Sequence, residues 1–439
     1  RGEAALRGQA ARLREHLLTL GATGPADLAD VAFSLAGTRA SLEHRAVVLG
    51  ADLPELLSGL DDVVAGVTPV AGPVGSGDTD PVFVFPGQGG QYAGMALRLW
   101  DSSPVFAASM AECEAALAPY VDWHGRTLRD LLAGADGTDG AADSDGAAGA
   151  DGVGGVDTGH AEQVQPMLFA VMVSLARLWI SQGVVPSAII AHSVGEVAAA
   201  HIAGILTLAD AARVLTARAR VSGRVTGYAT LWVGLPADQV RDRVAHLTGV
   251  HVSVVNGPRS VVVTGPLDSI AALRAEYEAA GVRARPIPMD YPTHSPDMAV
   301  VEDELLALLT DIRPAAASVP YYSPTLARRV EGDELDGRYW FTNLVRPVRF
   351  HDTCAALLAD GYRVLLEVAP HPLLAPAIEE TAEEGGVEAT VLATLRRGES
   401  DPEMFLRSTA AAWRAGLTVD WSAVFAGNGA RRVDLPTYA

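Results

Sequence analysis

The stretch from Ala191 to Glu196 constrains the fold of this chain more than any other part of its sequence. An apolar run over 184–190 leads into it, and small residues with helical spacing follow over 197–205. This order predicts a strand, a sharp turn and a helix, with Ser193 in the turn. The spacing A-x-S-x-G is close to the G-x-S-x-G of a nucleophile elbow, where small residues flank a serine because the turn is tight.

Ser193 has two interpretations at this stage. A serine at such a turn lies at the positive end of the following helix, where backbone N–H groups can stabilise an oxyanion. A serine in front of a helix is also a common N-cap with no catalytic role. The motif alone favours neither interpretation, so the rest of the chain has to distinguish them.

Charge and composition exclude several classes of protein. The net charge of -20 argues against a nucleic-acid-binding surface, because phosphate binding needs basic residues. Cys113 and Cys354 lie far apart, which gives neither a disulfide framework nor a metal site. Free thiols fit a reduced cytoplasmic location. The sequence has no uninterrupted run of roughly 18 apolar residues, so we expect no membrane span. Both ends look cut from a longer pattern, so we expect a piece of a multidomain protein.

Strands and helices alternate through most of the chain, which predicts a largely parallel sheet covered on both faces. The first 75 residues are expected to form a small α/β unit, with helices over 4–20, 27–35 and 53–59 and a strand over 44–49. The Pro/Gly-rich residues 68–80 indicate a linker. Residues 134–159 are mostly Ala, Gly and Asp, which predicts a flexible surface insertion.

Residues 228–288 break this alternation. Their pattern predicts the order β-α-β-β-α-β, which is that of a ferredoxin-like subdomain inserted into the larger sheet. Further strands are expected over 319–322, 363–368 and 390–395, followed by a helix over 403–415.

A serine hydroxyl needs a base that accepts its proton. His294 follows the last strand of the inserted subdomain, where the chain returns to the large sheet, so we expect it in a cleft between the two. An exposed loop histidine is the alternative. His192 is a rival base, but its side chain should point away from Ser193 across the turn.

Two backbone N–H groups could stabilise the oxyanion of a tetrahedral intermediate. One belongs to Val194, directly after the serine, and the other to Gln88, in the Gly-rich loop after the strand over 81–85. That loop could instead bind phosphate, but it lacks the Lys-Ser/Thr of a P-loop and the G-x-G-x-x-G spacing.

Four motifs occur in a fixed order: P-G-Q-G at 86–89, A-H-S-V-G-E at 191–196, Arg218, and D-Y-P-T-H at 290–294. Together they resemble the acyltransferase domain of a modular type I polyketide synthase, which is related to the malonyl-carrier-protein transacylases of fatty acid synthesis. The resemblance covers essentially the whole chain.

The resemblance implies specific roles. Ser193 would be the acylated nucleophile, His294 the general base, and Gln88 and Val194 the oxyanion hole. Arg218 matches the arginine that holds the free carboxylate of the extender unit, and a guanidinium suits this because it pairs with a carboxylate through two hydrogen bonds. The alternative is that Arg218 lies on a solvent-exposed helix face and binds no substrate.

The remaining residues implied at the substrate are Tyr291, Thr293, Gln165 and Asn256. In this family a backbone group usually orients the histidine.

The fold implied is α/β: an α/β-hydrolase-like large subdomain with a mostly parallel sheet, a ferredoxin-like small subdomain and a small N-terminal α/β linker domain. The implied boundaries are 1–75 for the ketosynthase–acyltransferase linker, 81–221 with 289–395 for the large subdomain, 222–288 for the small subdomain and 396–439 for the post-acyltransferase linker.

The implied reaction is ping-pong transfer of an (alkyl)malonyl unit from acyl-CoA to the phosphopantetheine arm of an acyl carrier protein, in polyketide and antibiotic biosynthesis. No permanently bound cofactor, metal, nucleic acid or membrane is implied. The expected partners are the acyl carrier protein and a neighbouring ketosynthase domain.

The motifs that bear on the extender unit point in different directions. Val194 matches malonyl-selective relatives, Tyr291 matches methylmalonyl-selective ones, and Thr293 replaces the Phe of malonyl-selective ones. The smaller side chain favours an α-substituted malonyl unit, methylmalonyl or larger. Alternatives are a malonyl-selective acyltransferase, a serine hydrolase or thioesterase using the same elbow, and a docking platform that has lost activity.

Overall fold

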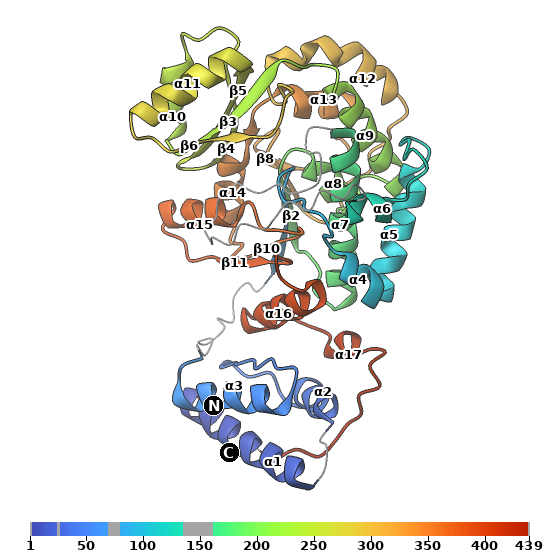
Figure 1. The fold of residues 1–439 in the computed structure, drawn as a ribbon, viewed down its shortest axis with the longest axis vertical. Coiled ribbons are helices and arrows are strands. Elements are labelled where there is room, and N and C mark those ends of the chain that lie inside the picture. Colours follow the sequence, from blue (N-terminus) through green and yellow to red (C-terminus); the bar gives the residue numbers. More distant parts are fainter. Residues whose placement is uncertain (1, 24–26, 69–79, 135–160, 438–439) are drawn as a thin grey trace. The chain divides into compact units, whose positions relative to one another are not determined.

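A computed structural model describes residues 2–23, 27–68, 80–134 and 161–437 of the chain (Figure 1). The expected linker over 68–80 and the expected insertion over 134–159 lie almost wholly outside the described residues. The chain divides into two compact units, one made of Arg1–Thr79, Trp179–Val185 and Phe405–Ala439 and the other of Asp80–Leu178 and Pro186–Met404. The subdomain boundaries expected from the sequence stay a prediction.

The second unit is built on a six-stranded sheet with the order β11-β10-β1-β2-β7-β8. All neighbouring strands are parallel except β7 and β8. The strands are β1 (Pro81–Phe85), β2 (Ala188–Ala191), β7 (Tyr321–Ser323), β8 (Arg328–Val330), β10 (Val364–Glu367) and β11 (Thr390–Ala393). Every residue of β1 and β2 is buried, as expected of strands covered on both faces.

Helices cover this sheet on both sides (Figure 1). Val82 and Val84 of β1 pack in one cluster with Phe350 of α14 and Ile378 of α15, and α8 contacts β1 and β2. The helices of this unit are α4 (Leu97–Ser102), α5 (Pro104–Leu117), α6 (Leu128–Ala133), α7 (Ala161–Ser181, up to Leu178), α8 (Gly195–Ile202), α9 (Leu208–Ser222), η1 (Pro296–Val301), α12 (Glu302–Leu308), α13 (Gly337–Val345), α14 (Phe350–Ala359) and α15 (Ala375–Glu384).

Helix α7 is long and apolar enough to cross a membrane by length and composition, with a mean hydropathy of 1.5. In the structure, 83% of that stretch is buried inside the fold. A mostly buried helix of this kind is the core helix of a packed domain, and its apolar character is explained by that burial.

The second sheet has the order β6-β3-β5-β4-β9. Its elements are β3 (Tyr228–Val233), α10 (Ala237–Val244), β4 (His251–Gly257), β5 (Ser260–Pro266), α11 (Leu267–Ala279), β6 (Ala284–Ile287) and β9 (Val348–Arg349). The β-α-β-β-α-β order expected over 228–288 is confirmed. The strand β9 was not expected: it comes from outside that stretch and pairs parallel to β4.

In the other unit, α1 (Glu3–Thr23), α2 (Leu28–Thr38) and α3 (Leu53–Ala65) form as the sequence predicts. Helix α16 (Asp401–Arg414), from Phe405 on, and α17 (Trp421–Val424) follow later in the chain. The strand expected over 44–49 is wrong, because no strand forms among the described residues there. Ala46 and Val48 instead pack beside Leu17 and Val63 in a helical cluster, which Leu435 also joins. Their apolar alternation reflects this packing, since the described residues of the stretch form no strand.

The loop after β1 and the turn after β2 lie side by side, because Phe85 and Ala191 are register partners in neighbouring parallel strands. A Cβ atom on Gly195 would lie 2.2 Å from the carbonyl oxygen of Pro86 and 2.5 Å from that of Phe85. Only glycine fits this contact, because a backbone carbonyl cannot rotate away as a side chain can. The turn that carries Ser193 therefore depends on Gly195.

We expect Gly195→Ala to lower the free energy of unfolding by about 1–3 kcal/mol, the usual cost of overpacking. Gly223→Ala is the matched control, because a Cβ there would meet only ordinary contacts at 3.9 Å and its φ is -65°. Urea unfolding of the full chain measures both. Equal stability of the two variants would contradict the close approach.

Candidate active site

Ser193 occupies a strained turn at the carboxyl end of β2. Its φ of 54° lies in the left-handed region, which non-glycine residues rarely adopt. The turn is closed by hydrogen bonds from Gly195 N–H to His192 O (2.9 Å) and from Glu196 N–H to Ser193 O (3.0 Å). The N–H of Val194 donates no hydrogen bond within the described residues. It therefore stays available at the amino end of α8 for a developing negative charge.

His294 meets Ser193 across 101 positions of sequence. Its Nε2 lies 2.6 Å from Ser193 Oγ. Its Nδ1 lies 3.2 Å from the carbonyl oxygen of Arg346, and its backbone N–H donates to Leu344 O at 2.7 Å. A carbonyl only accepts, so Nδ1 carries the proton and Nε2 is the nitrogen that can accept the hydroxyl proton of Ser193. The group that orients the histidine is thus the Arg346 carbonyl.

The surroundings of His294 keep its imidazole neutral. The side chain is 2% exposed, and burial lowers its pKa well below 6.5. The nearby positive charge of Arg218 and the His192 ring lower that pKa further. A neutral imidazole is the form that accepts a proton, so this environment suits a general base.

His192, the rival base, does not contact the Ser193 hydroxyl through a hydrogen bond. Neither ring nitrogen has a hydrogen-bond partner within the described residues, and the ring lies against Phe350 with centroids 6.0 Å apart. Burial lowers its pKa to about 4. The position of His192 also explains Gly87, where a Cβ would lie 2.9 Å from the ring Nδ1.

Tyr291 lies between the Gly-rich loop and helix α7. Its hydroxyl donates to Gln88 Oε1 at 3.1 Å and accepts from Gln165 Nε2 at 3.5 Å. The ring is 3% exposed, and burial raises the pKa of its hydroxyl. Since the Gln88 side chain is held at its amide oxygen, Tyr291 also restrains the loop that carries the Gln88 backbone N–H. Three of the expected site residues therefore form one connected group.

Arg218 is a buried cation on α9. It is 2% exposed, and within the described part of the chain its guanidinium forms no hydrogen bond or ion pair. Burial lowers its pKa to about 10, while the nearby Tyr291 and Glu196 oppose that shift. A buried guanidinium without a bound partner is costly unless an anion pairs with it. The solvated helix face considered as an alternative does not describe Arg218, although Arg220 on the same helix is exposed.

The last two expected residues lie beside this group. Asn256 lies close to His192, and its buried Oδ1 has no hydrogen-bond partner within the described residues. Thr293 is half-buried next to His294, and its N–H donates to Tyr291 O at 3.0 Å. Both are therefore near the site, but neither contacts the Ser193 hydroxyl.

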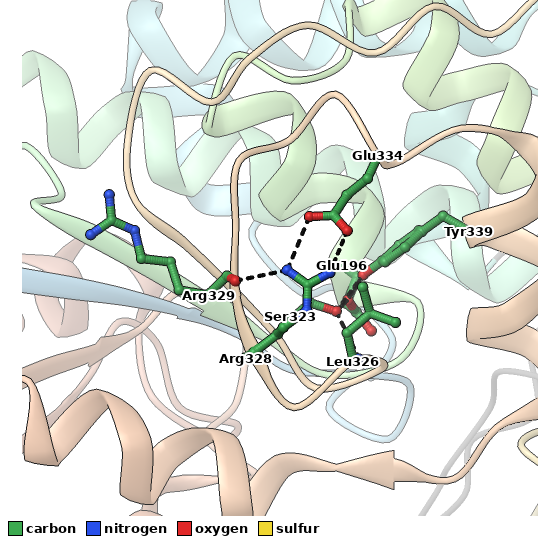
Figure 2. Close-up of polar contacts among 7 residues, drawn as sticks. All are labelled: Glu196, Ser323, Leu326, Arg328, Arg329, Glu334 and Tyr339. Carbon is green, nitrogen blue, oxygen red and sulfur yellow. Dashed lines mark hydrogen bonds and ion pairs between the residues drawn. The ribbon is translucent and has the colours of Figure 1, made fainter.

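Glu196 is the residue whose environment the sequence did not reveal. It is fully buried, and its carboxylate accepts hydrogen bonds from Tyr339 Oη, from Thr325 Oγ1 at 2.8 Å and from Asn343 Nδ2 at 2.7 Å. Figure 2 shows Tyr339 and Ser323 gathered next to Glu196. Burial raises the pKa of Glu196, and these hydrogen bonds lower it in part.

Among the described residues, no group of three or more His, Cys, Asp or Glu side chains could hold a metal ion. The polar groups near Ser193 are those of an imidazole, a guanidinium, amides and a phenol. Such a set can deprotonate a hydroxyl, stabilise an oxyanion and bind a carboxylate.

The sequence profile of the family described as "Acyl transferase domain" matches residues 82–419 of the chain. The polyketide synthase GfsE of Streptomyces halstedii is 44% identical over 441 residues, which cover 99% of this chain and 11% of that synthase. The chain therefore spans only a small part of the length of this curated relative.

Two solved structures are also similar. The acyltransferase domain from module 8 of the salinomycin polyketide synthase is 43% identical with a TM-score of 0.85, covering 96% of this chain and 95% of that one. The acyl transferase domain of SpnD, in complex with 2-(pent-4-yn-1-yl)malonyl, is 27% identical with a TM-score of 0.81, covering 95% and 94%.

The lowered pKa of His294 predicts a pH profile. Protonation removes the base, so the reaction of Ser193 with a fluorophosphonate should keep its full rate from about pH 8 down to about pH 6.5. The rate should fall only well below that range, because burial and Arg218 oppose protonation. Labelling rates measured across pH, with Ser193→Ala as the unreactive control, test this. A midpoint at or above the ordinary histidine pKa would contradict it.

Proposed function

Because the chain belongs to the acyl transferase domain family of modular polyketide synthases, we propose that Ser193 and His294 load an extender unit from acyl-CoA onto an acyl carrier protein. Family membership confirms the resemblance, the α/β fold class and the acyltransferase activity expected from the sequence. The observation that carries the proposal is the 2.6 Å approach of Ser193 Oγ to His294 Nε2, beside the buried guanidinium of Arg218.

The first half-reaction forms an acyl-enzyme. His294 Nε2 takes the Ser193 proton as Oγ attacks the thioester carbon of the acyl-CoA. The oxyanion of the tetrahedral intermediate accepts hydrogen bonds from the backbone N–H groups of Val194 and Gln88. The C–S bond then breaks, His294 returns its proton to the CoA sulfur, and the acyl group remains on Ser193 as an ester.

The second half-reaction reverses these steps with a new thiol. His294 takes the proton of the phosphopantetheine thiol of a carrier protein, and the sulfur attacks the ester carbon. The same N–H groups stabilise the oxyanion, and Ser193 leaves with the proton that His294 returns. No permanently bound cofactor or metal enters either step. The chain would act in the cytoplasm beside a ketosynthase domain of the same polypeptide.

Arg218 gives the site its preference for a carboxylated acyl group. A bound malonyl-type carboxylate would pair with the guanidinium through two charge-assisted hydrogen bonds and neutralise a buried charge. Its positive charge acts on both His294 and Tyr291, which supports a carboxylate site near the reacting ester. This buried cation also favours a transferase over a general serine hydrolase or thioesterase.

The extender unit we favour is an α-substituted malonyl group, methylmalonyl or larger. Thr293 adjoins His294 and is smaller than the Phe that the resemblance gives to malonyl-selective relatives, so it leaves room near the substrate α-carbon. The SpnD domain, solved with a long α-substituted malonyl group, is a relative whose fold accommodates such a substituent. Malonyl alone is the alternative extender.

Arg218→Ala should slow acylation of Ser193 by malonyl-type CoA esters by a factor of at least about 100, because it removes two hydrogen bonds to a charged group that contribute about 1.5–3 kcal/mol each. Acylation by acetyl-CoA, which has no carboxylate, should not slow. Arg220→Ala, on the exposed face of the same helix, is the control. Acyl-enzyme mass spectrometry measures both. Equal losses with the two kinds of ester would contradict the carboxylate role.

Equimolar malonyl-, methylmalonyl- and ethylmalonyl-CoA should label Ser193 mainly with the substituted units. Thr293→Phe should shift this ratio toward malonyl by about tenfold, since a pocket discriminates a methylene by about 1–3 kcal/mol. The mass added to Ser193 gives the ratio directly. Predominant malonylation of the unmodified chain would reject the choice of an α-substituted extender.

A further inference from the structure

The proposed transfer reaction does not use the carboxylate of Glu196, although this group lies at the base of the serine turn. Glu196 is 0% exposed and forms no ion pair among the described residues. Its backbone N–H closes the turn by donating to Ser193 O at 3.0 Å. Whatever holds the Glu196 side chain therefore also holds the backbone of the nucleophile.

The groups that hold this side chain come from two elements. Tyr321 Oη, 3.2 Å away, and Thr325 Oγ1, 2.8 Å away, come from β7 and the turn after it. Tyr339 and Asn343 come from helix α13. Asn343 Nδ2 donates to Glu196 Oε1 at 2.7 Å and to Thr325 Oγ1 at 3.0 Å, and it lies 3.5 Å from Ser193 O. Asn343 itself is 0% exposed.

The end of the same helix holds the base. The carbonyl oxygen of Leu344 accepts from the His294 backbone N–H at 2.7 Å, and that of Arg346 lies 3.2 Å from His294 Nδ1. Within 343–346, the side chain of Asn343 hydrogen-bonds to the serine turn, and the carbonyls of Leu344 and Arg346 contact His294. Helix α13 is thus a common support for two residues that are far apart in sequence.

We propose that Glu196 and Asn343 are positioning residues, which hold the serine turn on helix α13 and so set the distance between Ser193 Oγ and His294 Nε2. The inference rests on the proposed function, because it assigns both atoms to one proton transfer. A displacement of about 1 Å between reacting groups can slow an enzyme about 100-fold. Removing one donor leaves the buried carboxylate with one hydrogen bond fewer, so the side chain can shift.

Two variants test this, with the labelling of Ser193 by a fluorophosphonate as the readout. Asn343→Ala removes one of the two hydrogen bonds from α13 to the Glu196 carboxylate, and Tyr339→Phe removes the other while keeping the ring. Thr342→Ala is the control on the same helix, because its hydroxyl donates only to Arg338 O at 2.8 Å near the surface. Both test variants should slow labelling at least tenfold, and the control less than twofold.

The amplitude and the rate constant of labelling separate positioning from stability. The amplitude counts the folded molecules, whereas the rate constant reports the geometry of each folded site. With methylmalonyl-CoA, the maximal acylation rate should fall with less than a twofold change in the half-saturating concentration. Wild-type rate constants with a reduced amplitude would overturn the proposal, as would loss of the folded state in both variants.

The fluorophosphonate also separates this inference from the proposed function, because it needs no acyl-CoA. If the unmodified chain is labelled but no malonyl-type ester acylates it, the function is wrong and the labelling rates still decide the positioning role. If the esters acylate it and Asn343→Ala reacts at the wild-type rate, the positioning role alone is wrong. An unmodified chain that fails to react with the fluorophosphonate overturns both.

Discussion

The contact between the Ser193 hydroxyl and the His294 imidazole is the interaction on which the rest of this structure depends. The two atoms are 2.6 Å apart but 101 positions apart in sequence, and the intervening chain builds the whole ferredoxin-like part of the second sheet. Neither sheet alone supplies the pair. The large sheet ends in the serine turn, and the chain leaving the second sheet brings back the histidine.

Both residues have a backbone conformation that side chains disfavour, with φ values of 54° at Ser193 and 62° at His294. Such conformations persist only where the surroundings over-determine them. Around Ser193 this is done by the close approach of Gly195 to the β1 loop and by the buried side chain of Glu196. Around His294 it is done by the carbonyls of Leu344 and Arg346.

Sequence reasoning predicted what side-chain chemistry and apolar periodicity encode: the strand, turn and helix around Ser193, the β-α-β-β-α-β order, and most of the side chains near the site. The resemblance implied that a backbone group orients His294 but not which one, because the residue type of Arg346 carries no signal for the role of its carbonyl. Sequence reasoning predicted a strand over 44–49 because packing on helices and pairing in a sheet produce the same apolar alternation over so short a stretch. Strand β9 has two residues, which is too few for any periodicity.

That short strand has a mechanical consequence. Val348 and Arg349 pair with β4 in the second sheet, and Arg346, two positions before Val348, binds the imidazole through its carbonyl. A displacement of the second sheet would therefore also displace the Arg346 peptide, whose carbonyl orients the His294 imidazole. The second sheet therefore helps to orient the general base, although His294 itself lies outside its strands.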